Sequence, residues 1–478
     1  MASLQRLYNH LPVQLQNAAT SMQGLLYRRT RFAGEYVCYL NYLTQTEFAS
    51  ADELRSLQAM ALRRMLRIAA DHVPYYAGAF QKHGVEWQEI AGPEDLHRIP
   101  PTPKHRLREQ PLAFRRQFGS RQRTVAWHTS GTTGSPIELV YSVEAVQRLY
   151  AFVELYRRQA GILPGERRAQ FTGKTIVPAR QRKADKRFWR FDIANRSLLL
   201  STVHLHPENL DAYTQAIHDF RPTHITGYPS AIAVLAQFYQ RATVLPPRLK
   251  AVLTTAETLS THQRALIEST FATRVYDQYG QAEMQSFWYE CPNGSLHAHP
   301  LAGVTEILRP DGLPALPGEI GEVVLTGLVN DAMPLIRYRV GDLARLAGHG
   351  CPCGRSMPVI EEIFGRKEAY LVTRDRGFVG RLDPAFKGVR HIAESQVSQI
   401  SLDLVKVSVV PAPEFSQQDE NRLRHNLRDM LGASVEIVIV KVDRLPRGPN
   451  GKLQAVTSQL APEINVSSPV GVSLAELS

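Results

Sequence analysis

The first 95 residues carry apolar side chains at helical intervals. Between residues 51 and 72, leucine, methionine and isoleucine recur with the three- to four-residue spacing of an amphipathic helix. Ser50 directly precedes this stretch, and Glu53 lies three residues after Ser50. This capping pattern predicts that the helix begins after Ser50. Prolines between residues 98 and 104 predict a loop. We therefore expect residues 1–95 to form a helical part of a larger domain.

The pattern changes after about residue 124, where short β-branched segments alternate with helical ones. Residues 223–229 are typical of a strand and are followed by a helical stretch; residues 249–257 and 260–271 repeat this order. Such alternation favours an α/β architecture with parallel strands. A β-rich stretch then runs from about residue 303 to residue 346.

A second, smaller domain is predicted to begin near residue 366. Strand-like segments there surround one helical stretch at residues 417–431. The chain of 478 residues is too long for one compact core. The predicted fold class is α/β, a large multi-layer N-terminal domain with parallel-type sheets plus a small mobile α+β C-terminal domain. The expected parts are residues 1–95 and 96–365 of the large domain, the small domain 366–460 and a loose tail 461–478.

The net charge of +11 favours negatively charged binding partners but does not distinguish among their classes. It suits nucleotides, coenzymes, nucleic acids or an anionic membrane surface. Basic residues gather at 104–123 and 180–190, as two solvated faces or as an anion groove, and no nucleic-acid motif accompanies them. Four cysteines make no disulfide framework. With no signal-like apolar core and no apolar run near ~20 residues, we expect a cytoplasmic protein without a membrane span.

A loop rich in glycine and hydroxyl groups follows the apolar segment 124–128. Residues 129–136 read TSGTTGSP, and glycines there would let backbone N–H groups approach phosphate oxygens closely. A flexible surface loop is the alternative. The Walker pattern is absent because no Gly-Lys-Ser/Thr ends the loop, which disfavours a P-loop NTPase.

Four further segments follow this loop in a fixed order along the chain. They are YDQYGQAEM at 276–284, LIRYRVGDLARL at 335–346, FGRKEAY at 364–370 and LPRGPNGKLQ at 445–454. Together the five segments resemble the ordered motifs of the adenylate-forming superfamily of acyl–CoA synthetases. VPYYAGAF, RIPPTPKHRLRE, GYPSAI and CPCGR resemble the phenylacetate–CoA ligase branch in particular. Residues 11–31 and 380–399 are similar to the subgroup associated with capsular polysaccharide and secondary-metabolite genes.

The resemblance implies a two-step reaction and a role for each motif. A carboxylate attacks the α-phosphate of ATP and releases pyrophosphate, and a nucleophile, usually the thiol of coenzyme A, then displaces AMP. Cations and N–H donors must offset the repulsion among these anions. The implied nucleotide-binding residues are Ser130, Gly131, Thr132, Thr133 and Gly134 for the β- and γ-phosphates, Ala256, Glu257, Tyr279 and Gly280 for the adenine and α-phosphate, and Asp342 for the ribose.

Three residues are implied in catalysis: Glu283, Arg366 and Lys452. Glu283 would hold Mg²⁺, a hard cation that prefers carboxylate and phosphate oxygens. Arg366 would contact ribose or phosphate at the domain junction, and Lys452 would be the mobile catalytic lysine on its Gly-rich loop. Glu257 has a helix-capping role as its alternative, and Arg339 is interpreted as an ion-pair partner of a nearby acid.

The sequence departs from the family at two places. Ile137 and Glu138 stand where many relatives have a lysine after the proline, which removes a cation from the triphosphate site. The hinge usually reads Gly-Arg-x-Asp, whereas Lys367 and Glu368 follow Gly365-Arg366 here. The rebuilt segment after the hinge makes coenzyme A less certain as the acceptor than adenylation itself.

Three of the four cysteines fall in two short turn-rich segments. Cys291 with His297, and Cys351 with Cys353, make a set of three thiolates and one imidazole that suits tetrahedral Zn²⁺. Phenylacetate–CoA ligase relatives show a similar arrangement, which implies a structural zinc ion. His299 is the rival for His297, and buried unreactive thiols are the alternative. Cys38 is interpreted as a small core residue.

The acid substrate is the least specified feature. Tyr228, Pro229 and Ser230 are expected to line its pocket, and their aromatic and small side chains suggest an aromatic acid. The prediction is an AMP-forming ligase that uses ATP, Mg²⁺ and coenzyme A and acts as a monomer or homodimer. An amide ligase with an amine acceptor and a non-catalytic nucleotide-binding scaffold are the alternatives.

Overall fold

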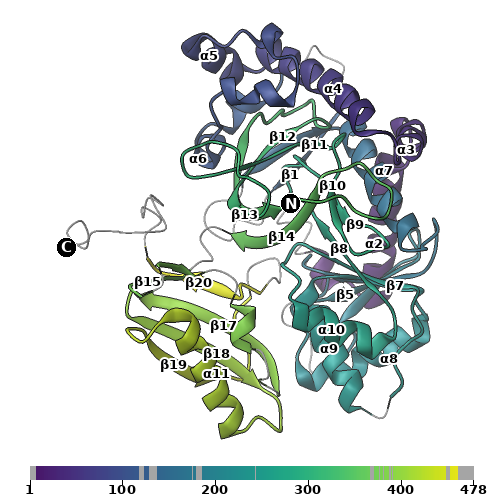
Figure 1. Cartoon of the computed structure of the whole chain (residues 1–478). Coiled ribbons are helices and arrows are strands. Elements are labelled where there is room, and N and C mark those ends of the chain that lie inside the picture. The colour runs from purple at the N-terminus through teal and green to yellow at the C-terminus, as the bar shows by residue number, and fades with distance from the viewer. Residues whose placement is uncertain are drawn as a thin grey trace.

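The computed structural model divides the chain into a large body and a smaller one (Figure 1). It describes residues 7–117, 123–128, 137–174, 176–178, 186–242, 244–366, 371–375, 377–379, 382–386, 389, 391–447 and 453–460. The large body holds the helices and strands up to β14, and the smaller one holds β15 to β20 with α11. The predicted fold class is confirmed: the fold is mixed α/β, with a large many-stranded sheet and a separate C-terminal domain.

Helices dominate the N-terminal part, as predicted. They are α2 (Val13–Arg31), α3 (Glu35–Gln45), α4 (Ala51–His72), α5 (Pro74–His83) and α6 (Lys104–Glu109), with short 3₁₀ helices η1 (Trp87–Glu89), η2 (Pro93–Arg98) and η3 (Pro111–Phe114). The predicted serine cap of α4 is confirmed, since Ser50 Oγ accepts the Glu53 N–H at 3.2 Å. The prediction for Cys38 is wrong: this cysteine is exposed, because α3 turns its buried face toward α7 through Leu40 and Leu43.

A twelve-stranded sheet forms the centre of the large body, in the order β11-β12-β13-β14-β10-β9-β8-β7-β6-β3-β5-β4. Its parallel half comprises β3 (Arg168–Thr172), β5 (Ser197–Ser201), β6 (His224–Gly227), β7 (Ala251–Thr255) and β8 (Val275–Tyr279), with antiparallel β4 (Trp189–Asp192) at the edge. Helices α8 (Leu210–Phe220), α9 (Pro229–Arg241) and α10 (Thr261–Phe271) make the crossovers, preceded by α7 (Val143–Gln159) and η4 (Pro207–Asn209). This is the predicted strand–helix alternation.

The other half of the sheet is antiparallel and continuous with the first through the β8–β9 pair. Its strands are β9 (Trp288–Glu290), β10 (Leu296–Ala298), β11 (Gly303–Leu308), β12 (Ile320–Gly327), β13 (Tyr338–Leu346) and β14 (Val359–Arg366). The β-rich pattern predicted strands here but not this continuity. A separate antiparallel hairpin, β1 (Thr124–His128) with β2 (Glu138–Ser142), lies beside it.

The strand order sets the place of a ligand site. Within the parallel half the chain reverses direction across the sheet between β3 and β6. In open α/β sheets, ligands bind outside the carboxyl ends of the strands at such a switch point. The two strands approach so closely there that a Cβ on Gly227 would lie 2.6 Å from the Phe171 Cβ. Only glycine therefore fits at this position at the end of β6.

The small domain has its own sheet and core. Strands β17 (Ile392–Ser401), β18 (Leu404–Pro411), β19 (Glu436–Lys441) and β20 (Val456–Ser458) form a sheet in the order β19-β18-β17-β20. Helix α11 (Gln417–Leu431) packs on it through Leu423, Leu427 and Leu431, which are buried. The β15 (Leu371–Thr373) and β16 (Gly377–Val379) pair and η6 (Asp383–Phe386) complete the described part. The exact domain boundaries stay a prediction, and the predicted tail lies outside the described residues.

Candidate active site

Predicted site residues gather at the carboxyl ends of three adjacent parallel strands. Tyr228, Pro229 and Ser230 follow β6, Ala256 and Glu257 follow β7, and Tyr279 and Gly280 lie at the end of β8. Because these strands are parallel neighbours, their carboxyl ends meet at one edge of the sheet. The fold therefore brings the expected acyl-pocket and nucleotide residues into one region.

Glu257 connects two elements at this edge. One carboxylate oxygen accepts the Ser230 N–H at 3.2 Å and the other accepts the Leu453 N–H at 3.1 Å. The first contact caps the free N-terminal end of α9, so the capping alternative holds, although for a helix 27 residues earlier in the chain. The second contact reaches the small domain. Ala256 has a φ of +70°, a strained conformation for a residue with a Cβ, which is typical of functional sites.

Tyr228 lies half-buried at the N-cap of α9. Burial, with a further contribution from the nearby Glu257 carboxylate, raises the pKa of Tyr228 to about 12. The phenol therefore stays protonated at neutral pH and can donate a hydrogen bond. Ser230 is buried beside it, so this corner offers an aromatic ring and two hydroxyl groups.

Tyr279 and Asp342 are joined directly. The Tyr279 hydroxyl donates to Asp342 Oδ2 at 2.6 Å, and its ring stacks on Trp288 with the centroids 4.2 Å apart. Asp342 is buried in β13, and its backbone pairs with that of Arg366 at the end of β14. Asp342, the predicted ribose contact, thus lies beside Tyr279, the predicted adenine contact.

Glu283 is a buried carboxylate held by a tyrosine. The Tyr338 hydroxyl donates to Glu283 Oε1 at 3.2 Å, which leaves the second carboxylate oxygen for another partner. Burial, together with the Glu283 carboxylate, raises the pKa of Tyr141 beyond its ordinary range, and the Tyr141 hydroxyl donates to the Ala282 carbonyl. A single fixed carboxylate suits Mg²⁺, which commonly takes one or two protein carboxylates plus substrate phosphates.

The phosphate loop and the catalytic lysine lie outside the described residues, but their flanks do not. Ser130, Gly131, Thr132, Thr133 and Gly134 connect β1 to β2, whose ends pair as His128 opposite Glu138. β1 and β2, on either side of the loop, pair antiparallel. Glu138, the second residue after Pro136, forms an ion pair with Arg115 at 2.7 Å. The acid is therefore neutralised locally.

The flanks of the Lys452 loop reach the large domain. Arg447 and Leu453 form an isolated bridge that closes the loop at its base. Arg447 donates to Ser230 Oγ at 3.3 Å and forms an ion pair with Glu394. The side chains of Arg447 and Glu394 are 15% and 14% exposed. Together with the Leu453–Glu257 bond, these contacts anchor both ends of the loop at the predicted acyl pocket.

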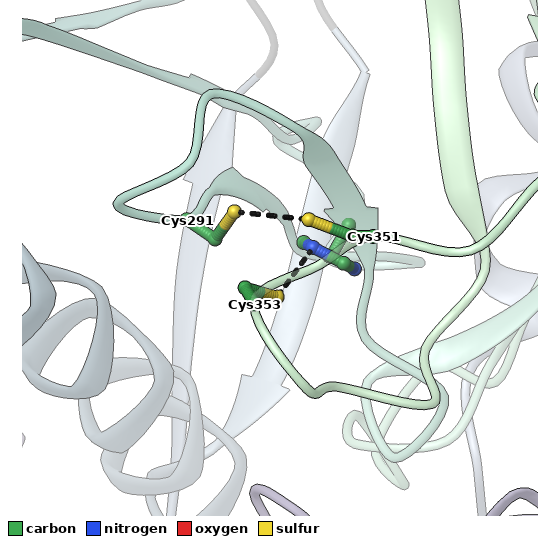
Figure 2. Close-up of side chains that lie close together, drawn as sticks. Cys291, Cys351 and Cys353 are labelled. Carbon is green, nitrogen blue, oxygen red and sulfur yellow. Dashed lines mark hydrogen bonds between the residues drawn. The ribbon is translucent and has the colours of Figure 1, made fainter.

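Three cysteines and one histidine form a separate cluster (Figure 2). The metal-binding atoms of Cys291, His297, Cys351 and Cys353 all lie within 4.8 Å of one another. Cys291 Sγ lies 3.7 Å from Cys351 Sγ, and Cys353 Sγ lies 3.4 Å from His297 Nε2. Zn–S bonds of about 2.3 Å in a tetrahedron hold two sulfurs about 3.8 Å apart, so the spacing fits zinc.

The surroundings of the cluster also fit a metal. His297 Nδ1 lies 3.4 Å from the Met357 carbonyl oxygen, so Nδ1 can donate and leave the Nε2 lone pair for a metal. Burial lowers the pKa of His297, which keeps the imidazole neutral. His299 is not part of the cluster: its Nδ1 accepts the Leu301 N–H at 3.3 Å.

Some residues at the site escaped the sequence analysis. Trp288 lies outside the five segments, and Tyr338 lies inside LIRYRVGDLARL without a predicted role, because hydrogen bonding and ring stacking between distant strands are properties of the folded sheet. Arg447 stands inside the LPRGPNGKLQ segment, in which the sequence analysis assigned a role only to Lys452. Its partner Glu394 lies 53 residues earlier. Arg339 pairs with Glu322 at 3.6 Å, as predicted.

Comparisons with known proteins place these features in a wider group. The CapK C-terminal domain matches residues 371–459. Protein CapK of Staphylococcus aureus is 25% identical over 94% of this chain and 98% of its own length. Phenylacetate-coenzyme A ligase of Thermus thermophilus is 26% identical over 87% of this chain and 98% of its own, and the Escherichia coli enzyme is 26% identical over 85% and 95%.

A solved structure shows the same fold. The structure of 2-hydroxyisobutyryl-CoA ligase in the postadenylation state is 19% identical, with a TM-score of 0.71 over 87% of this chain and 91% of that protein. These similarities confirm the resemblance predicted from the five ordered segments. Within the described residues, no helix has the length and apolar character needed to cross a bilayer.

Proposed function

The chain is a homologue of protein CapK and of the phenylacetate–CoA ligases, and we propose from this kinship that it is an ATP-dependent, AMP-forming ligase that joins a carboxylic acid to coenzyme A. The observation that carries the proposal is the gathering of Glu257, Tyr279 and Asp342 at one edge of the sheet, where Glu257 also accepts the N–H of Leu453, the residue after Lys452. That edge is where open α/β sheets bind nucleotides.

Each residue has a proposed role in adenylation. Tyr279 presents a ring to the adenine and orients Asp342, whose carboxylate accepts the ribose hydroxyls. Ser130, Gly131, Thr132, Thr133 and Gly134 hold the β- and γ-phosphates, and Glu283 holds the Mg²⁺ that offsets their charge. Lys452 and Arg366 supply positive charge at the reacting carboxylate and α-phosphate. Ala256 and Gly280 contribute backbone walls to the nucleotide site.

The acid is proposed to enter beside Tyr228, Pro229 and Ser230. An aromatic ring, a buried hydroxyl and the carboxylate-held N-terminus of α9 surround this position. A flat, aromatic acid could stack on Tyr228, which favours the aromatic class. Cys291, His297, Cys351 and Cys353 are proposed to hold a structural Zn²⁺; four protein ligands leave no open coordination position for chemistry.

The test isolates the first half-reaction. ATP–pyrophosphate exchange is measured across a panel of aromatic and aliphatic carboxylic acids, without coenzyme A or amine. We expect exchange with a subset of aromatic acids, and its loss in Lys452→Ala. Lys406→Ala is the matched control, because Lys406 is exposed on β18 of the same domain. Absence of exchange with every acid, despite ATP binding, would favour the nucleotide-binding scaffold instead.

The acceptor is decided in a second assay. With the active acid and ATP present, AMP release is followed after addition of coenzyme A or of an amine series. Stimulation by coenzyme A with a thioester product is expected. Stimulation by an amine alone would instead establish the amide ligase and would leave the adenylation proposal intact.

A further inference from the structure

Helix α2 turns its apolar side away from the protein. The residues that it buries are Gln16, Thr20 and Gly24, which are polar or small. Leu15, Met22 and Leu26 are 51%, 61% and 56% exposed. A surface helix of a globular protein normally buries its apolar stripe and exposes its polar one. In α2 this arrangement is inverted.

The inverted orientation is fixed by polar contacts to the edge strand β4. Arg190 Nε donates to Gln16 Oε1 at 2.6 Å, and both side chains are buried. A Cβ on Gly24 would lie only 2.2 Å from a carboxylate oxygen of Asp192, so the helix approaches β4 as closely as glycine allows. Rotating α2 to bury its leucines would leave the Arg190 guanidinium buried without this acceptor. The exposed stripe therefore belongs to the folded state.

The stripe is continuous along the helix and is extended by a neighbour. Leu15, Met22 and Leu26 are spaced by seven and four residues, which places them on one side of α2. Leu25 is 40% exposed on the flank of the stripe. Ile193, in the turn after β4, is 75% exposed, and its N–H donates to Ser21 Oγ at 3.0 Å. An apolar surface of this kind marks an interaction site.

Charge indicates what kind of partner covers the stripe. Residues 13–31 contain no acidic side chain, and the last turn carries Arg28, Arg29 and Arg31. Arg28 and Arg29 are exposed; Arg28 Nη1 donates to the Ala194 carbonyl oxygen at 3.1 Å, and neither arginine forms an ion pair with any residue that the structure describes. An apolar stripe that ends in arginines without an acidic partner among the described residues matches the boundary between acyl chains and anionic headgroups. A second copy of α2 would offer these arginines no acid.

We propose that α2 binds the surface of an anionic lipid bilayer, lying in its plane with Leu15, Met22 and Leu26 among the acyl chains and Arg28 and Arg29 at the phosphates. The protein is then a peripheral membrane protein through this helix. This inference is independent of the proposed function, since none of these residues lies at the candidate active site.

The test uses the full chain and vesicles of two compositions. Co-sedimentation is measured with phosphatidylcholine vesicles and with phosphatidylcholine–phosphatidylglycerol vesicles, at low and high salt. We expect binding to the anionic vesicles that weakens with salt. The triple variant Leu15→Ser, Met22→Ser, Leu26→Ser and the double variant Arg28→Gln, Arg29→Gln should each lower the partition coefficient about tenfold or more.

A matched control separates this stripe from exposed apolar residues in general. The triple variant Leu112→Ser, Leu163→Ser, Leu316→Ser removes side chains that are 68%, 61% and 61% exposed on other elements and should bind vesicles like the parent. Circular dichroism checks that all variants fold. The proposal is overturned if the control variant loses as much vesicle binding as the α2 variants, or if the parent protein does not bind anionic vesicles. A dimer seen by light scattering that the α2 variant alone dissociates, without vesicle binding, would assign the stripe to a second copy.

Discussion

The Tyr279 hydroxyl donates to Asp342 at 2.6 Å, although their strands β8 and β13 are not neighbours in the sheet. The bond therefore joins the side chains of two strands that do not pair with each other. If Asp342 binds the ribose, Tyr279→Phe should raise the KM for ATP about three- to tenfold, the loss of roughly 1 kcal/mol for one hydrogen bond. Asp342→Asn, which also removes the charge, should raise it further. Both are measured by ATP–pyrophosphate exchange.

Tyr239→Phe is the control for this prediction. Tyr239 is also buried, but its hydroxyl finds no hydrogen-bond partner among the residues that the structure describes. Its removal should leave the KM for ATP unchanged. Equal KM values for Tyr279→Phe and the parent would show that the hydroxyl does not orient a nucleotide-binding group.

Arg447 fixes one end of the Lys452 loop to the large domain through Ser230 and Glu394. Arg447→Met removes both contacts and leaves a buried carboxylate unpaired, so the loop should lose its anchored position. We expect the exchange rate to fall about tenfold to a hundredfold, the 1.4–2.7 kcal/mol of one or two charged hydrogen bonds, with ATP affinity little changed. ATP binding is measured separately by calorimetry.

Arg444→Met tests whether the effect is specific. Arg444 is exposed and stands three residues earlier in the same segment, so its loss should not alter exchange. In a double-mutant cycle, Glu394→Gln should recover part of the activity lost in Arg447→Met, because the buried charge disappears. Additive losses would contradict a functional Arg447–Glu394 pair.

The Cys/His cluster predicts a bound metal with a structural role. Purified protein should contain about one zinc per chain, and Cys351→Ser or Cys353→Ser should lose it and lower the Tm by about 5–10 °C. Cys38→Ser, the control at an exposed cysteine outside the cluster, should keep both. Mass spectrometry of the metal content and a thermal melt decide the matter. Full zinc content in the Cys353→Ser variant would contradict the four-ligand assignment.

Local signals predicted much of this molecule. The Ser50 cap and the alternation of β6, α9, β7 and α10 follow from short-range patterns, and the structure contains them. The structure also brings together Cys291, His297, Cys351 and Cys353, which were grouped from their residue types and the family resemblance. The inverted orientation of α2 and the exposure of Cys38 did not follow. Whether an apolar position faces inward depends on which element packs on the other side, as with the buried Gln16–Arg190 pair, which joins segments 174 residues apart.

A pH prediction concerns His224 on β6, which is buried. Burial first, then the nearby Arg157, Arg168 and Lys250, lower the pKa of His224 from 6.5 to about 3. The native imidazole stays neutral while the unfolded one takes up a proton below pH 6.5. His224 thus contributes full stability above pH 6.5, and this contribution is lost as the pH falls toward 3, at about 1.4 kcal/mol per pH unit.

His224→Asn should therefore flatten the dependence of unfolding free energy on pH by about this slope between roughly pH 4 and pH 6. Denaturant unfolding over this range measures the slope, which does not depend on any constant change in packing caused by the substitution. His83→Asn, at an exposed histidine at the end of α5, should leave the slope as it is. Parallel profiles for His224→Asn and the parent would mean that a proton reaches the buried ring in the native protein, and that the cations around β6 do not exclude it.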